Sequence, residues 1–217
     1  MSFFLLAFPA LFSIVNPLGG AFIFLGATEH FGVRLRNELA KWIAIYSFAI
    51  VTASMYVGAY VLTFFGISIS VLRAAGGIVI AAAAWRMLNT PDDESPKTAE
   101  DVAADLPTTR AVSRMAFYPL TMPITTGPGT ISVAVSLGTN RPRGTAELLL
   151  SFIGQSLLAI VLICALVYAL YRYSAPLSRL IGPTGTVIVT RLSAFLLFCI
   201  GVQVFWNGAA ELLATVR

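Results

Sequence analysis

The chain has 217 residues, of which 58% are hydrophobic and only 11% are charged, whereas soluble domains carry about 25% charged residues. This composition excludes an ordinary soluble domain and predicts an integral membrane protein. The formal net charge of +4 does not indicate nucleic-acid binding, because the basic residues are spread singly over the connections between apolar segments.

Three apolar segments in the first part of the chain are long enough to span a bilayer. The first runs from Ser2 to Thr28, and the second runs from Trp42 to Phe65 without a charged residue. A tight turn then leads to the third span, which ends at Leu88. The third span carries small residues that allow close helix approach: Gly76, Gly77 and Ala81 to Ala84.

A hydrophilic stretch separates these spans from three more. Proline and acidic residues in the stretch 89–115 predict a flexible cytoplasmic linker. Residues 172–186 are rich in proline and glycine and are predicted to be a connection. The remaining spans are Ala116 to Gly138, Ala146 to Tyr171, and Val187 to Leu213. The predicted domains are therefore a first three-helix repeat at 1–88, the linker at 89–115, and a second three-helix repeat at 116–217.

Proline and glycine interrupt the first and fourth spans in their middle. The interruptions are Asn16-Pro17-Leu18-Gly19-Gly20 and the stretch from Pro123 to Thr130. Proline donates no N–H, and its ring clashes with the carbonyl four residues earlier. Unsatisfied backbone groups in a bilayer cost several kcal/mol each, so such breaks persist only where protein, water or a solute supplies hydrogen bonds. Interrupted segments at corresponding places in two halves indicate a transporter's binding site.

The two halves match in their arrangement. The interruptions are about 110 residues apart, and each broken span is followed by a span without charge. Each third span has one arginine near its start, Arg73 or Arg191. Because a half with three spans crosses the membrane an odd number of times, the second half enters inverted. We therefore predict an all-α membrane protein with six transmembrane helices in 3+3 inverted repeats, of which helices 1 and 4 are discontinuous.

The distribution of lysine and arginine predicts the orientation. The connections after spans one, three and five hold eight of these residues, and the other connections and the C-terminus hold three. Because basic residues are enriched in cytoplasmic loops, we expect the odd-numbered connections in the cytoplasm. Both termini are then periplasmic.

The broken helices indicate a ligand class. A half-helix that begins in the bilayer presents unpaired N–H groups, and one that ends there presents carbonyls. Two facing breaks suit a small zwitterion with an uncharged side chain. The alternative is a pair of proline kinks packed against neighbouring helices, but the matched positions favour a site. The candidate binding residues are Asn16, Pro17, Leu18, Gly19, Gly20, Thr125, Thr126, Gly127, Pro128, Gly129 and Thr130.

Four further polar residues are supporting candidates. Arg73 and Arg191 lie inside spans, where an arginine faces a cavity or a partner, or snorkels to the interface. A third possibility is that each arginine bonds the open carbonyls of a broken helix. Gln203 and Asn207 are more often interhelical hydrogen-bonding residues than ligands. The sequence shows no carboxylate at mid-depth that would carry a proton.

Several motifs resemble the MarC family of bacterial inner-membrane proteins. They are Asn16–Gly20, Gly66–Ile69, Leu72–Gly77, Pro119–Pro123, Gly127–Ile131 and Arg191–Asn207. Through the family's small-neutral-amino-acid transporter branch, SnatA-like, the resemblance implies movement of glycine, alanine or serine across the inner membrane, with proton coupling. The implied partners are the amino acid, protons and the lipid bilayer.

The sequence fits other functional classes less well than it fits a coupled transporter. An intramembrane protease needs a Ser–His pair, paired aspartates or a His-Glu-x-x-His helix, whereas the one histidine of the sequence, His30, lies in a connection. We therefore expect no enzyme, and the two cysteines show no metal-ligand spacing and imply no cofactor. An uncoupled facilitator or channel, or an exporter of another small polar metabolite, remains the alternative. A scaffold would need no matched breaks.

Overall fold

The computed structural model describes residues 2–28, 31–89, 109–142 and 144–216, and these residues form helices joined by short connections. In chain order the helices are α1 (Phe3–Val15), α2 (Pro17–Ala27), α3 (Val33–Phe64), α4 (Ile69–Asn89), α5 (Thr109–Met115), the π-helix η2 (Ala116–Thr125), α6 (Pro128–Gly138), α7 (Ala146–Arg172) and α8 (Ser174–Val216). The predicted all-α class is confirmed for the described residues.

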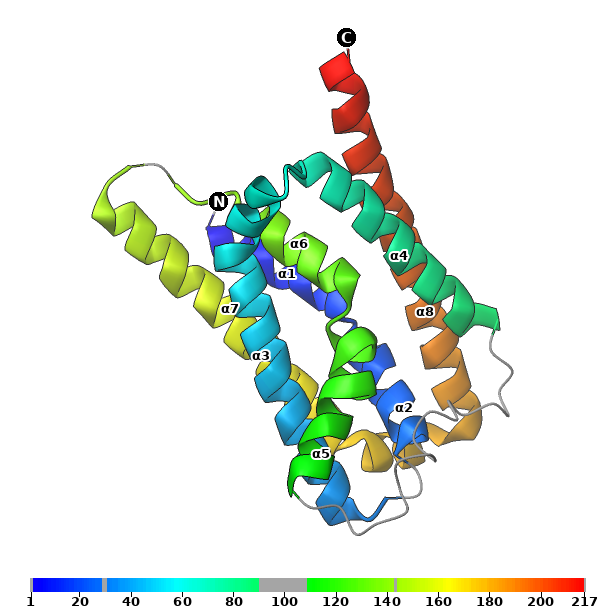
Figure 1. The fold of residues 1–217 in the computed structure, drawn as a ribbon. Coiled ribbons are helices and arrows are strands. Elements are labelled where there is room, and N and C mark those ends of the chain that lie inside the picture. The colour runs from blue at the N-terminus through cyan, green and yellow to red at the C-terminus, as the bar shows by residue number, and fades with distance from the viewer. Residues whose placement is uncertain (1, 29–30, 90–108, 143, 217) are drawn as a thin grey trace.

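Successive segments run in alternating directions. In Figure 1, α1 and α2 run downward, α3 runs upward and α4 runs downward again. The segment of α5, η2 and α6 then runs upward, followed by α7 downward and α8 upward. Both termini consequently lie toward the upper end of the view, and α2 ends at the lower end, where α5 begins.

Five helices of the described residues are long and apolar enough to cross a membrane, by length and composition. They are Phe3–Ala27, which includes the first break, Val33–Phe64, Ile69–Asn89, Ala146–Arg172 and Thr184–Ala214. The segment predicted as the fourth span is divided between η2 and α6, and α6 is a shorter apolar helix. The apolar lengths are those of a multi-pass integral membrane protein.

Three helices extend into segments that were predicted to be connections. Helix α3 begins at Val33 rather than Trp42, α5 occupies the end of the predicted linker, and α8 begins at Ser174. Arg36 donates to the carbonyl oxygen of Thr28 at 3.0 Å, so the charged start of α3 satisfies the end of α2. The rest of the predicted linker, 90–108, lies outside the described residues.

Helix α8 bends where the sequence predicted a connection. Gly182 adopts φ 77° and ψ 169°, which interrupts the helical conformation inside α8. A positive φ of this kind is accessible to glycine at little cost. The predicted connection is therefore a short helix, residues 174–181, followed by a glycine kink, and the long apolar part of α8 starts at Thr184.

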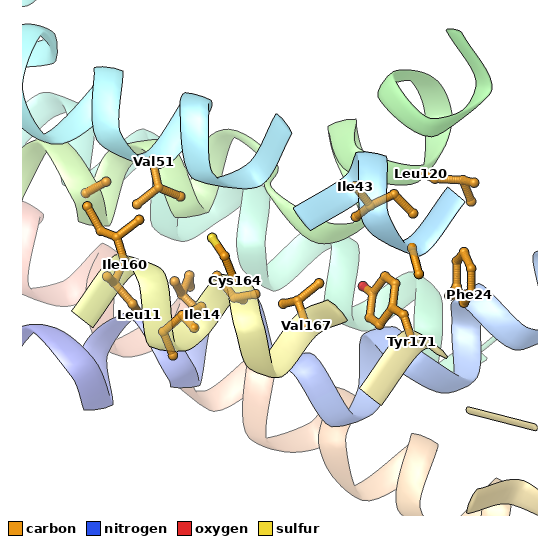
Figure 2. Packing of buried hydrophobic residues seen from close by; sticks show 14 of the residues in the cluster. Leu11, Ile14, Phe24, Ile43, Val51, Leu120, Ile160, Cys164, Val167 and Tyr171 are labelled. Atoms are coloured by element: carbon orange, nitrogen blue, oxygen red, sulfur yellow. The ribbon is translucent and has the colours of Figure 1, made fainter. Parts of the chain in front are cut away.

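The buried core surrounds α7. This helix packs against α1, α2 and α3, and Figure 2 shows side chains from all of these helices meeting along it. Because lipid tails are as apolar as these side chains, the packing is stabilised mainly by close van der Waals contact. The labelled members of this core are Leu11, Ile14, Phe24, Ile43, Val51, Leu120, Ile160, Cys164, Val167 and Tyr171.

Helices α4 and α8 cross at unusually close range. A Cβ on Gly201 would lie 2.5 Å from the backbone nitrogen of Ala81, and one on Gly77 would overlap the backbone of Phe205. On a neighbouring face of α4, a Cβ on Gly76 would lie 2.5 Å from the side chain of Ser132 in α6. The prediction that small residues in this span allow close helix approach is confirmed.

Candidate functional site

The first broken span turns at one residue. Asn16 adopts a left-handed conformation, with φ 46° and ψ 62°, between the end of α1 and the start of α2. Its side-chain oxygen accepts from the N–H of Gly19 at 3.2 Å, and its carbonyl oxygen accepts from the N–H of Gly20 at 2.9 Å. Asparagine tolerates this conformation better than most residues. The predicted interruption is present, with Pro17 as the first residue of α2.

The second broken span is irregular over a longer stretch. Tyr118 and Met122 have extended backbone conformations inside η2, and each precedes a proline. The proline ring disfavours a helical conformation in the residue before it. The chain leaves helical geometry again at Thr126 and Gly127, and α6 begins at Pro128. The interruption predicted at 123–130 is present, but it is preceded by a distorted π-helix that was not predicted.

Two buried threonines satisfy the backbone of this distorted segment, and a third bonds a side chain of α3. The hydroxyl of Thr121 donates to the carbonyl of Ala116 at 2.7 Å, and that of Thr125 donates to the carbonyl of Leu120 at 2.8 Å. Thr126 donates its hydroxyl hydrogen to Ser47 of α3 at 2.8 Å. The side chains of Thr125 and Thr126, both candidate ligands, are therefore engaged within the protein.

Tyr171 joins the two breaks. Its hydroxyl is 2.9 Å from the Thr125 hydroxyl, and a Cβ on Gly20 would overlap the same oxygen atom. The ring stacks on Phe24 of α2, with centroids 4.8 Å apart (Figure 2). The side chain is fully buried. Tyr171 is not among the residues predicted from the sequence, because a tyrosine at the end of a span cannot be distinguished there from an interfacial aromatic residue.

Leu18 and Pro128 are the exposed residues at the starts of α2 and α6. Leu18 is 40% exposed and Pro128 is exposed, whereas Gly129 and Thr130 are buried. The N–H groups at the second and third positions of a helix have no acceptor within it. In α2 the Asn16 side chain satisfies one of these groups, but α6 starts without a side-chain cap. Backbone N–H groups at the start of α6 can therefore donate to an anionic group.

Glycine permits close packing behind both half-helices. A Cβ on Gly19 would lie 2.9 Å from the Cβ of Ser193 in α8, and one on Gly129 would overlap Ile80 in α4. Helix α2 therefore packs against α8, and helix α6 packs against α4. Gly127 has an extended backbone, with φ −82° and ψ −177°, which any residue can adopt.

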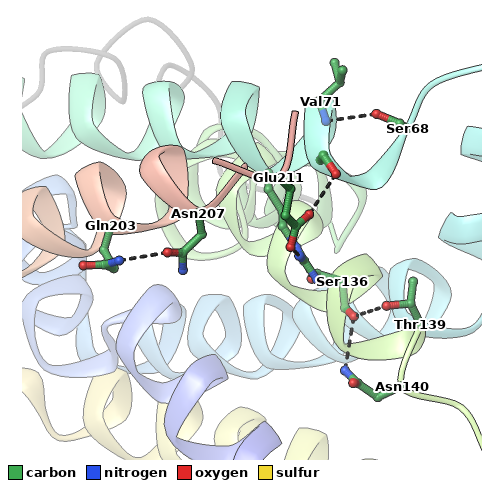
Figure 3. Close-up of polar contacts among 10 residues, drawn as sticks. Ser68, Val71, Ser136, Thr139, Asn140, Gln203, Asn207 and Glu211 are labelled. Atoms are coloured by element: carbon green, nitrogen blue, oxygen red, sulfur yellow. Dashed lines mark hydrogen bonds and ion pairs between the residues drawn. The ribbon is translucent and has the colours of Figure 1, made fainter. Parts of the chain in front are cut away.

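Arg73 lies near the start of α4, and Arg191 lies inside α8. Arg73 donates from Nε to the Ser136 hydroxyl of α6 at 2.7 Å and forms an ion pair with Glu211 of α8. Figure 3 shows Glu211 and Ser136 together at this junction. Arg191 donates to the carbonyl of Leu88, near the end of α4. These contacts join the first part of α4 to α6 and α8, and the end of α4 to the middle of α8.

Gln203 and Asn207 form a pair on α8. The amide nitrogen of Gln203 donates to the side-chain oxygen of Asn207 at 2.9 Å, and both residues are exposed. Figure 3 shows their side chains on the side of α8 that faces away from α4. This contact is within one helix, so it does not join the pair to either break.

The fold and the paired breaks define a class: a multi-pass, all-helical integral membrane protein in which two helices are interrupted next to each other. Comparison with protein families matches residues 1–213 to the MarC family integral membrane proteins. The chain belongs to the MarC family.

Individual relatives cover nearly the whole chain. An inner membrane protein MarC of Salmonella paratyphi A is 35% identical over 210 residues, which are 94% of this chain and 93% of the relative. A membrane protein of Archaeoglobus fulgidus is 34% identical over 221 residues, covering 100% of this chain and 96% of the relative. An inner membrane protein MarC of Escherichia coli O1:K1 is 34% identical over 210 residues. No solved structure matches the chain.

Proposed function

We propose that this protein is a secondary transporter that moves small neutral amino acids, such as glycine, alanine and serine, across the bacterial inner membrane. The movement is coupled to protons, and the solute binds at the two breaks. Alternating access exposes the site first to one side and then to the other.

The observation that carries the proposal is the junction of the two breaks at Tyr171. One hydroxyl group contacts Gly20 of the first broken span and Thr125 of the second. Helix α2 also contacts η2, and α1 contacts α6. Interrupted backbone in a bilayer requires hydrogen-bonding partners, and two interruptions side by side supply both donors and acceptors to one small solute.

The chemistry of this junction favours a small zwitterion. The uncapped start of α6 supplies N–H groups and the positive end of a helix dipole for a carboxylate. The end of η2 and the Asn16 side chain supply oxygen atoms for an ammonium group. Gly19 and Gly129 are already packed against Ser193 and Ile80, and this tight packing favours a solute with a small side chain.

The helix contacts support six spans in two inverted repeats. When the halves are exchanged, α1 corresponds to η2, α2 to α6, α3 to α7, and α4 to α8. The contacts follow this exchange: α2 packs against α7 and α8, α6 packs against α3 and α4, and α1 and η2 pack against α7 and α3. The central α4–α8 contact maps onto itself. In this proposal η2 and α6 together make the fourth span.

The proposed orientation places both termini in the periplasm. Both lie toward one end of the molecule in Figure 1, as an even number of crossings requires. The excess of lysine and arginine in the odd-numbered connections assigns the opposite end to the cytoplasm. The inner-membrane location follows the printed names of the Salmonella and Escherichia relatives.

The test is uptake of labelled glycine and alanine by proteoliposomes, with and without an imposed proton gradient. Accumulation against the solute gradient that requires the proton gradient supports a coupled carrier. Downhill flux alone would replace it with a facilitator or channel. No flux of either amino acid would overturn the proposed substrate class.

A further inference from the structure

We propose that Tyr171 is a positioning residue that locks the two broken helices together and closes the binding site at the lower end of Figure 1. This inference rests on the proposed function. Alternating access requires the site to be closed on one side at a time, and Tyr171 would close one of the two sides. The lock consists of the Tyr171–Thr125 hydrogen bond and the contact between the Tyr171 hydroxyl and Gly20.

The position of Tyr171 between elements is the first observation. Its backbone belongs to α7, its hydroxyl bonds η2, and its ring stacks on Phe24 of α2 with an interplanar angle of 20°. One side chain therefore holds three elements, two of which are the lower parts of the broken spans. The Tyr171 hydroxyl is bonded to Thr125 of η2 and lies against Gly20 of α2, so a movement of α2 relative to η2 must change at least one of these two contacts.

The burial of the layer around Tyr171 is the second observation. Phe24, Thr28 and Thr121 are each at most 1% exposed, and Tyr171 itself is fully buried. This layer lies between the breaks and the end of the molecule where α2 ends and α5 begins. By contrast, Leu18 at the start of α2 is 40% exposed. The breaks are thus covered by buried side chains on the Tyr171 side.

The close approach at Gly20 is the third observation. With any other residue at position 20, the Cβ would occupy the place of the Tyr171 hydroxyl. The Tyr171 ring fills a buried layer and stacks on Phe24, as a phenylalanine ring would, so the hydroxyl is the part that packing alone does not require. The hydroxyl bonds Thr125 of the second break and lies against Gly20 of the first break. We therefore assign it the role of connecting the two broken spans.

The experiment measures access of a thiol reagent to the buried layer and needs no substrate. A cysteine is introduced by Thr121→Cys in a Cys199→Ser background, since Thr121 is buried one turn from Thr125 in η2. Cys164 of α7, which is buried, remains as an internal reference. Tyr171→Phe is then compared with Tyr168→Phe, whose hydroxyl bonds Arg172 on the same helix.

We expect Tyr171→Phe to accelerate labelling at position 121 by about threefold to tenfold, the range of one interhelical hydrogen bond in a membrane. Labelling of Cys164 should not change, and Tyr168→Phe should behave as the parent protein. Equal acceleration at both cysteines would reveal general loosening and overturn the lock, as would no acceleration at position 121. If Tyr171→Phe does not fold, Thr125→Val removes the same bond together with the bond from Thr125 to Leu120, and Thr125→Ser, which can keep both bonds, is its control and should behave as the parent protein. Because the readout is independent of transport, its failure is distinguishable from failure of the proposed function.

Discussion

The side-chain oxygen of Asn16 accepts a hydrogen bond from the backbone N–H of Gly19 at 3.2 Å. Asn16 is the one non-glycine residue with positive φ among the described residues. The residue therefore makes the turn between α1 and α2 and also caps the second of these helices. Both properties are those of asparagine, whose short amide side chain tolerates the left-handed region and bonds nearby backbone.

Two substitutions of Asn16 distinguish its role in the turn from its role as the cap of α2. Asn16→Gly keeps the backbone conformation accessible and should cost only a few tenths of a kcal/mol. Asn16→Ala loses the cap and places a Cβ in the left-handed region, so it should cost about 1–3 kcal/mol. The measurement is the unfolding free energy in mixed micelles. Equal stability of the two variants would contradict the assigned role.

Gly20 and Tyr171 should behave non-additively. Gly20→Ala forces a Cβ onto the Tyr171 hydroxyl, whereas the Cζ atom of the ring would be 3.3 Å away. Removal of the hydroxyl by Tyr171→Phe should therefore relieve part of the loss, with a coupling energy of about 0.5–3 kcal/mol. A double-mutant cycle on unfolding free energies gives this value. Simple addition of the two losses would argue against the contact.

The α4–α8 crossing should not accept a methyl group at Gly201. Gly201→Ala places its Cβ 2.5 Å from a backbone nitrogen of α4, which cannot rotate away, so we expect a loss of about 1–3 kcal/mol. Gly154→Ala is the matched control, because no atom lies within 4 Å of its Cβ position in α7. The control should be neutral or more stable by up to about 1 kcal/mol. Thermal unfolding of the two proteins makes the comparison.

The Arg73–Glu211 pair should contribute little. Both side chains are partly exposed, at 27% and 46%, and pairs of this kind contribute about 0–1 kcal/mol. Arg73→Gln and Glu211→Gln should lower the free energy of unfolding by similar amounts, because Arg73 also donates to Ser136 and Glu211 also accepts from Ser70. High salt should reduce the loss caused by Glu211→Gln. A loss far larger for one variant than for the other would contradict this assignment.

The breaks were predictable because their causes are local. Pro17 and Pro128 remove donors in the middle of apolar segments, and both begin the second half of a broken span. The distortion at Tyr118 and Met122 has an equally local cause, a following proline, and could have been predicted by the same reasoning. Helix ends were less predictable, because the start of α3 depends on the contact of Arg36 with the end of α2.

The partners of individual side chains were not predictable. Tyr171 contacts Thr125, which is 46 residues away in the sequence, and no spacing rule relates residues so far apart. Arg73 is likewise joined to Glu211 from the far end of the chain. Periodicity and proline positions identify elements, whereas such contacts depend on the tertiary packing of several helices.

The most direct measurement for the central claim is equilibrium binding of labelled glycine to the purified protein and to Gly127→Leu. The extended backbone of Gly127 accepts leucine without strain, and the new side chain would occupy the start of α6. Gly26→Leu is the control, because no atom lies within 4 Å of its Cβ position in α2. A site at the paired breaks predicts saturable binding that is lost in Gly127→Leu and kept in Gly26→Leu. Wild-type affinity in a folded Gly127→Leu protein would contradict the account.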